Sequence, residues 1–247
     1  MYDGILAETI RIHGHEGDLI DAYQARPLGP GPFPGIVVIH HMPGYDEGSK
    51  EITRTFAVNG YAAVCPNLHY RDAPDAGPQE AAAAAREAGG VPDDRCVGDV
   101  AGATAHLRAM PTSNGRVGVI GYCSGGRQSY IVACRLPIDA AVDCYGGRVV
   151  ASPEEITTRQ PVSPIEMTAD LRCPLLGLFG GLDRNPSPQH VALMAAALDA
   201  NGKTYEFHTY EQANHAFFAV DRPNYDVEAA LDGWQRILTF FGRQLRP

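Results

Sequence analysis

The segment 121–126 (Gly-Tyr-Cys-Ser-Gly-Gly) constrains the fold of this chain more than any other part, because it directly follows the apolar run 117–120. A buried strand that ends in a glycine-rich turn and leads into a helix is typical of a nucleophile elbow. The nucleophile in such a turn stands on a strained backbone, and a Cβ two positions to either side has no room. Cys123 has glycine at both positions, whereas Ser124 has Tyr122 two residues before it. The pattern therefore predicts a thiol nucleophile, Cys123.

Length and charge limit the class of protein. A chain of 247 residues with 45% hydrophobic and 20% charged residues is long enough for one α/β domain with a well-buried core. The net charge of −9, with no basic cluster, argues against nucleic-acid and anionic-membrane partners. Residues 1–9 do not resemble a secretory signal, and no apolar run approaches the roughly 20 residues of a membrane span. We expect a soluble, cytoplasmic protein.

Six cysteines are scattered without a CxxC pair or metal-ligand spacing. All except Cys123 are expected to be reduced and structural.

Apolar periodicity predicts strands that alternate with helices. An antiparallel pair is expected at 5–12 and 20–24, followed by strands at 35–40, 62–66, 116–121, 140–145, 174–179 and 204–210. Helices are expected at 49–58, 93–110 (with Asp93 as N-cap), 126–134, 188–201 and 226–241, with a short one within 72–92. This order predicts a single α/β domain over residues 1–247, with a mostly parallel central sheet and helices on both faces.

A nucleophilic cysteine needs a base, and the base needs a group that orients it. Asp183 follows the expected strand 174–179, and His215 follows the strand 204–210. The order of nucleophile, acid and histidine is that of an α/β-hydrolase, and the carboxyl ends of parallel strands border one crevice. Taken singly, Asp183 could be a turn or cap residue and His215 an ordinary loop histidine.

Four segments together resemble the dienelactone hydrolase family, a branch of the α/β-hydrolases with a cysteine nucleophile. They are 66–71 (Pro-Asn-Leu-His-Tyr-Arg), 121–126, 180–183 (Gly-Gly-Leu-Asp) and 215–218 (His-Ala-Phe-Phe). The resemblance spans nearly the whole chain. It implies an α/β-hydrolase fold without a cofactor, in which Cys123 is the nucleophile, His215 the base and Asp183 its orienting group. It also implies an oxyanion hole formed by the backbone N–H groups of Met42 and Ser124.

The chain departs from the family pattern at two places. His41 stands where family members carry a glutamate that helps to generate the thiolate. It could hydrogen-bond Cys123, pair with the thiolate as a cation, contact substrate, or only shape the oxyanion loop. Although His40 and His41 are adjacent, no carboxylate or cysteine at ligand spacing accompanies them, so no metal site is expected.

The second departure concerns the substrate. The family binds a substrate carboxylate with two arginines, and Arg71 matches one of them, while Ala219 stands at the position of the other. Arg71 could instead be a surface arginine or a partner of Asp72.

The expected activity is hydrolysis of a small ester or lactone, dienelactone-like, through an acyl-thiol intermediate. One alternative, favoured by Ala219, is a broad carboxylesterase or thioesterase acting on uncharged substrates. A non-catalytic small-molecule-binding protein of the same fold is another. A third is a redox sensor in which Cys134 or Cys144 resolves an oxidised Cys123. A monomer and a dimer are both compatible with the sequence.

Overall fold

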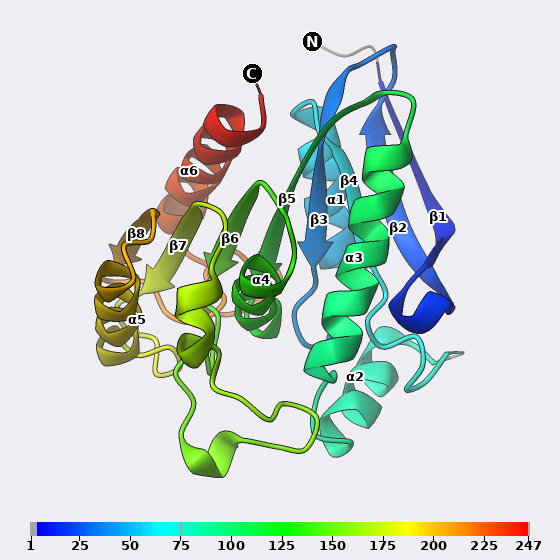
Figure 1. The fold of residues 1–247 in the computed structure, drawn as a ribbon. Coiled ribbons are helices and arrows are strands. Elements are labelled where there is room, and N and C mark those ends of the chain that lie inside the picture. The colour runs from blue at the N-terminus through cyan, green and yellow to red at the C-terminus, as the bar shows by residue number, and fades with distance from the viewer. Residues whose placement is uncertain (1–3, 75, 247) are drawn as a thin grey trace. The chain divides into compact units, whose positions relative to one another are not determined.

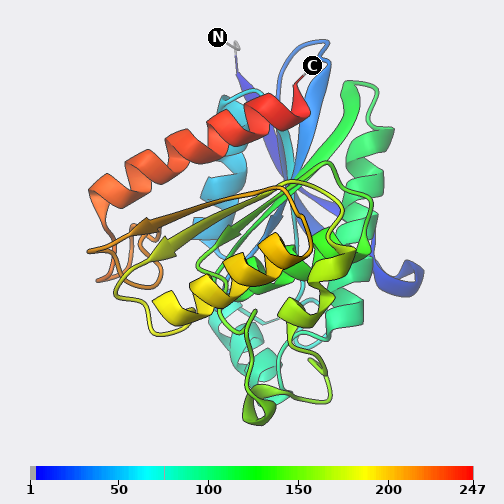
Figure 2. The same ribbon diagram turned by 60° about the vertical axis from the view of Figure 1, so that its left-hand side comes forward.

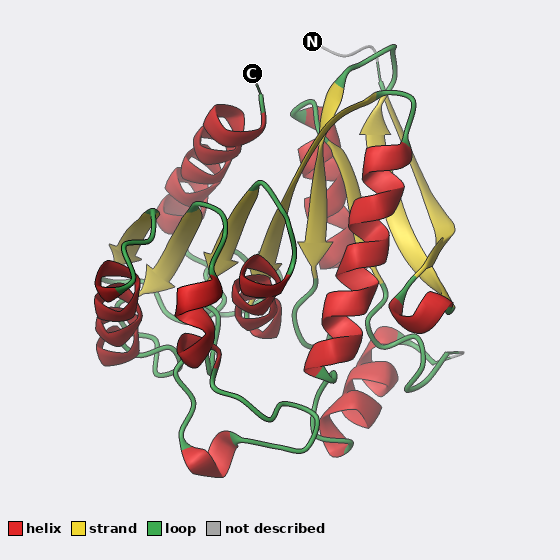
Figure 3. Ribbon diagram, viewed as in Figure 1, coloured by secondary structure: helices red, strands yellow, loops and turns green. Residues whose placement is uncertain are grey.

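The structure, a computed structural model, describes residues 4–74 and 76–246. Its strands are β1 (Ile5–His13), β2 (Leu19–Pro27), β3 (Phe33–Ile39), β4 (Ala62–Pro66), β5 (Ser113–Tyr122), β6 (Ala140–Cys144), β7 (Leu175–Gly180) and β8 (Tyr205–Tyr210). Its α-helices are α1 (Glu47–Val58), α2 (Pro78–Glu87), α3 (Asp93–Ala109), α4 (Ser124–Arg135), α5 (Pro188–Ala200) and α6 (Val227–Leu245). From β3 onward, most successive strands are separated by α-helices along the chain, as the periodicity predicts. Figure 3 shows the helices in red and the strands in yellow.

The strands form an eight-stranded sheet in the order β1-β2-β4-β3-β5-β6-β7-β8. β1 and β2 are antiparallel in the register Ile5↔Pro27 to His13↔Leu19, and β2 is antiparallel to β4. The pairs β3/β4, β6/β7 and β7/β8 are parallel. The prediction of an α/β fold with a mostly parallel sheet is confirmed.

Burial along the strands follows their place in the sheet. Every residue of β3, β4, β6 and β7 is buried, as expected for strands that are covered on both faces. The two edge strands, β1 and β8, consist largely of exposed and half-buried residues. The apolar runs that the sequence shows are therefore the central strands of the sheet.

The chain comprises two compact units. The first contains Met1–Val119 with Thr157–Pro161, and the second contains Ile120–Ile156 with Val162–Pro247. In the first unit, α1 and α3 lie on opposite faces of β3 and β4 (Figure 1). In the second, α5 and α6 lie on opposite sides of β7 and β8 (Figure 2). Within each unit, helices thus cover both faces of the strands, as predicted.

The start of α3 differs from the prediction. Pro92 occupies the N-cap position and makes no side-chain cap, and Asp93 is already the first helical residue. The N–H of Asp93 donates instead to the carbonyl of Arg159, at 3.0 Å. Because this acceptor comes from a distant segment, the local sequence pattern could not reveal it, and the prediction that Asp93 caps the helix is wrong.

Two glycines one turn apart bring α3 against the chain that follows β1. A Cβ on Gly102 would lie 1.8 Å from the carbonyl oxygen of His13, and one on Gly98 would lie 2.8 Å from the Cα of His15. Between these glycines, Asp99 accepts a hydrogen bond from the N–H of His15 at 2.8 Å. The helix can approach this closely only because both positions lack a side chain.

We predict that Gly102→Ala lowers the free energy of unfolding by about 2–3 kcal/mol, because the His13 carbonyl would have to move away from the helix. Gly77→Ala is the matched control, since a Cβ there meets open space and its φ is −65°. Its effect is expected to stay within about 0.5 kcal/mol. Equal urea midpoints for the two variants would contradict the close approach at Gly102.

Candidate active site

Cys123 occupies the turn between β5 and α4 in a strained conformation. Its φ is 56° and its ψ is −118°, a region that residues with a side chain rarely adopt. The N–H of Cys123 donates to the carbonyl of Cys144 at 3.0 Å, and its carbonyl accepts from the N–H of Gly126, also at 3.0 Å. The thiol-bearing residue is half-buried. This backbone has the form of the nucleophile elbow that the segment 121–126 predicts.

The glycines around Cys123 are required by contact distances. A Cβ on Gly121 would lie 1.8 Å from the carbonyl oxygen of Gly125. A Cβ on Gly126 would lie 2.7 Å from the Cα of Gly146, which follows β6. Either side chain would push the start of α4 away from its neighbours, so the turn tolerates only glycine at both places.

Asp183 lies in the loop after β7 and is buried, with 5% of its surface exposed. Its Oδ2 accepts a hydrogen bond from Nδ1 of His215 at 2.7 Å. Its Oδ1 accepts the N–H of Asn185 at 2.9 Å. With both oxygens bonded, the carboxylate has a fixed direction and sets the orientation of the imidazole.

His215 lies in the loop after β8 and interacts with both other members of the predicted triad. Burial lowers the pKa of His215, but hydrogen bonds with Asp183 and Cys123 and the charges of these groups raise it overall, from 6.5 to about 10. The imidazole therefore keeps its proton at neutral pH. The second unit thus brings together all three side chains that spacing singled out.

The two predicted oxyanion donors stand at different elements. Ser124 is the first residue of α4, and its N–H is among the first four of the helix, which have no intrahelical acceptor. Met42 is half-buried in the loop after β3. Their roles stay predictions.

His41 is held by its own loop. Its Nε2 lies 2.9 Å from Oδ2 of Asp46, whose Oδ1 accepts the N–H of Ser49 and caps α1. Burial raises the pKa of Asp46, but the His41 interaction and the Ser49 hydrogen bonds lower it below its usual range. Of the roles that the sequence left open for His41, this pairing favours shaping the loop.

His40, which sequence reasoning considered only as a metal ligand, ties two loops together as a buried neutral side chain. Its Nε2 accepts the N–H of Leu68 at 3.1 Å, so the proton is on Nδ1, which donates to the carbonyl of His41 at 3.0 Å. Burial and the nearby His69 lower the pKa of His40 from 6.5 to about 3. Burial likewise lowers the pKa of His69 to about 4.

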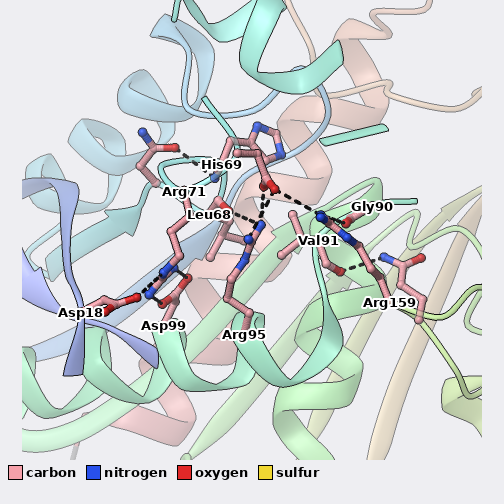
Figure 4. Close-up of polar contacts among 12 residues, drawn as sticks. Asp18, Leu68, His69, Arg71, Gly90, Val91, Arg95, Asp99 and Arg159 are labelled. Atoms are coloured by element: carbon pink, nitrogen blue, oxygen red, sulfur yellow. Dashed lines mark hydrogen bonds and ion pairs between the residues drawn. The ribbon is translucent and has the colours of Figure 1, made fainter. Parts of the chain in front are cut away.

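Arg71 lies in an ion-pair network of the first unit (Figure 4). Its Nε donates to Asp18 at 2.8 Å, and its terminal nitrogens donate to both oxygens of Asp99 at 3.0 Å. Asp99 is fully buried, and the Arg71 side chain is 19% exposed. The guanidinium is therefore already neutralised by two carboxylates.

Asp72 does not pair with Arg71, so that alternative is wrong. Its carboxylate instead accepts hydrogen bonds from Arg95 and Arg159.

Sequence reasoning overlooked Tyr145, which follows β6 with a φ of 41° and places its ring centroid 5.1 Å from that of His215. It also overlooked Asp143, a fully buried residue in β6 whose Oδ1 accepts the N–H of Gly146 at 2.7 Å. The one available signal in the sequence is a polar residue, Asp143, inside an otherwise apolar strand and two residues before the segment Tyr145-Gly146-Gly147. Asp143 therefore lies beside Gly126 of the elbow, and Tyr145 lies beside His215.

The thiols considered for redox chemistry are poorly suited to it. Burial raises the pKa of Cys134 to about 12 and that of Cys144 well above its ordinary value. A buried thiol with a raised pKa forms little thiolate and attacks an oxidised cysteine slowly.

No helix within residues 4–74 and 76–246 combines the length and apolar character that crossing a bilayer requires. Over the same residues, no three His, Cys, Asp or Glu side chains gather where they could hold a metal ion.

Acid should destabilise the protein through His40 and His69. Because both have lowered pKa values when folded, the unfolded chain binds more protons below its ordinary histidine pKa of about 6.5, and stability falls as the pH drops. We predict that His69→Phe reduces the slope of unfolding free energy against pH by about one proton between about pH 7.5 and about pH 5. Denaturant titrations across this range would measure it, and an unchanged slope would contradict the neutral buried state of His69.

Comparisons with known proteins show which family the chain belongs to. The sequence model of the dienelactone hydrolase family matches residues 20–245. A carboxymethylenebutenolidase of Pseudomonas putida is 31% identical over 249 residues, covering 96% of either chain. A carboxymethylenebutenolidase candidate of Methylorubrum extorquens is 34% identical over 241 residues, covering 97% of this chain and 81% of its own. The crystal structure of a dienelactone hydrolase candidate from Klebsiella pneumoniae subsp. pneumoniae has a TM-score of 0.88 at 31% identity, covering 98% of this chain and 100% of its own. The chain belongs to the dienelactone hydrolase family of ester and lactone hydrolases.

Proposed function

We propose that this chain hydrolyses a small ester or lactone with Cys123 as nucleophile, His215 as base and Asp183 as the group that orients the base. The observation that carries the proposal is the position of His215. Its Nδ1 is hydrogen-bonded to Asp183, and its side chain is also hydrogen-bonded to Cys123. A protonated imidazole next to a cysteine at a helix N-terminus favours a thiolate–imidazolium pair.

In the acylation step, the Cys123 sulfur attacks the carbonyl carbon of the substrate and forms a C–S bond. The carbonyl electrons move to oxygen and produce a tetrahedral oxyanion. The C–O bond then breaks, and the leaving alkoxide takes the proton from the His215 imidazolium. A lactone opens in this step without losing its alcohol, which stays in the acyl group.

We propose that the oxyanion is stabilised by the backbone N–H groups of Ser124 and Met42. The N–H of Ser124 points out of the first turn of α4, where the helix also contributes partial positive charge. Fixed backbone donors of this kind need no reorganisation when the charge develops.

Deacylation uses the same base. His215, now neutral, removes a proton from water, the hydroxide attacks the thioester carbonyl, and the C–S bond breaks. The products are a carboxylic acid and the thiolate–imidazolium pair. Each step uses only water and groups of this chain.

We predict that Cys123→Ala and Cys123→Ser each lower the hydrolysis of short-chain chromogenic acyl esters by roughly a thousandfold or more. Serine is expected to fail because a hydroxyl group ionises far less readily than a thiol and therefore forms no ion pair with His215.

Intact-mass spectrometry during turnover should detect one acyl group, on Cys123, because the other five cysteines are buried. The proposal would be wrong if both variants hydrolysed the esters as fast as the wild type.

The environment of Arg71 favours uncharged substrates, the alternative suggested by Ala219. Binding a substrate carboxylate would require Arg71 to leave Asp99, which is fully buried and would lose its cation. We therefore propose that the carbonyl compound hydrolysed here is recognised without an arginine pair for a carboxylate.

Arg71→Met tests this proposal by removing the charge and keeping the stem. The variant should lose about 3 kcal/mol of unfolding free energy, because Asp99 stays buried without its partner. Arg11→Met is the matched control, since Arg11 pairs with Asp21 at 3.3 Å on the surface, and it should lose less than about 1 kcal/mol. The ratio of kcat/KM for anionic and neutral esters should not change in Arg71→Met. A selective rise in KM for the anionic ester would instead assign Arg71 to substrate binding.

A further inference from the structure

Tyr145 combines burial with an unusual backbone. It is 2% exposed and directly follows β6, with a φ of 41° in the left-handed region. A bulky side chain in that region is strained, and such strain persists only where the surroundings impose it. The contacts of Tyr145 with its neighbours therefore indicate why this backbone conformation is maintained.

Hydrogen bonds hold the backbone on both sides of Tyr145. Its own N–H donates to the carbonyl of Leu178 in β7 at 2.9 Å. The N–H of the next residue, Gly146, donates to the buried carboxyl group of Asp143 at 2.7 Å. The chain turns sharply between these two hydrogen bonds, and the Tyr145 side chain points toward the loop after β8.

The side chain contacts the histidine loop at three residues. The ring centroid lies 5.1 Å from that of His215 at an interplanar angle of 60°, and 5.1 Å from that of Phe217. The hydroxyl group accepts a hydrogen bond from the backbone N–H of Phe218. Tyr145 thus contacts both the imidazole and the backbone that carries it.

The hydroxyl group stays uncharged beside the reacting groups. Burial raises the pKa of Tyr145 well above its ordinary value, and the neighbouring Cys144, Cys123 and Asp183 add to this effect. Tyr145 can therefore support His215 without exchanging protons with it.

We propose that Tyr145 is a positioning residue that keeps the imidazole of His215 aligned between Asp183 and Cys123. The hydrogen bond to Asp183 fixes the Nδ1 edge of the imidazole but does not by itself fix the tilt of the ring about that bond. The Tyr145 ring packs against the imidazole and restricts this motion, while the bond to Phe218 keeps the loop in place. The proposal rests on the catalytic roles of Cys123 and His215 given above.

The test measures alkylation of Cys123 by iodoacetamide, which reports the thiolate–imidazolium pair without requiring ester hydrolysis. The other cysteines are buried, and Cys123→Ala supplies the blank. Rates are compared at about pH 7, where the thiolate depends on His215, and at about pH 10, where thiols ionise unaided. Tyr145→Leu removes the ring and Tyr145→Phe removes only the hydroxyl group.

Tyr130→Phe is the matched control. Tyr130 is also buried, and its hydroxyl group forms a hydrogen bond with Thr168 at 2.6 Å, which does not involve the triad residues. We expect Tyr145→Leu to alkylate about tenfold more slowly than wild type at about pH 7 and within about twofold of it at about pH 10. In Tyr145→Phe the alkylation rate should fall about threefold at the lower pH, and in Tyr130→Phe it should equal that of the wild type. If Tyr145→Leu does not fold, the alkylation rates of Tyr145→Phe and Tyr130→Phe test the proposal.

The proposal is overturned if the Tyr145 variants alkylate as the wild type does at about pH 7, or if Tyr130→Phe loses as much. It is also overturned if Cys123 in the wild type reacts at about pH 7 no faster than an ordinary thiol. Ester hydrolysis is assayed on the same samples. If hydrolysis is absent and the alkylation pattern is as expected, the proposed function is refuted, and the result still supports the alignment of His215 by Tyr145.

Discussion

The left-handed turn at Cys123 is the constraint on which the rest of the candidate site depends. The turn exists because β5 ends, α4 begins and the chain after β6 passes within contact distance, with glycine at 121, 126 and 146 where the backbones meet. A residue in this conformation costs about 1–3 kcal/mol, which the surrounding packing must offset. In return, the thiol stands at the N-terminus of α4, within reach of His215. Its chemistry follows from a backbone geometry that few sequences can adopt.

Tyr145 has a similar backbone conformation at the end of the neighbouring strand. β5 and β6 are adjacent in the sheet, and each is followed directly by a side chain in the left-handed region. The N–H of Cys123 donates to the carbonyl of Cys144, so the two turns are joined by a backbone hydrogen bond. The strands supply the rigidity that keeps both side chains directed at His215.

A buried carboxylate pairs with a basic side chain in each unit, but the two pairs have different roles. Asp183 is buried and pairs with a half-buried imidazole, so the interaction orients a group that can gain and lose a proton. Asp99 is fully buried and pairs with Arg71, whose charge is permanent, so this interaction links α3 to two loops. The difference lies in the partner and its access to solvent. An arginine at a family motif position is therefore not by itself a binding residue.

The sequence alone was sufficient for the alternation of strands and helices, the elbow at Cys123, and the placement of Asp183 and His215 after strands. These features depend on local periodicity, glycine spacing and chain order, which a sequence displays directly. Only the tertiary structure decided the partners of Arg71, which are 28 and 53 residues away, and the N–H acceptor at the start of α3. It also decided the tautomer of His40 and the strained backbone of Tyr145. Such contacts join distant segments, and their geometry is set by packing that no local pattern encodes.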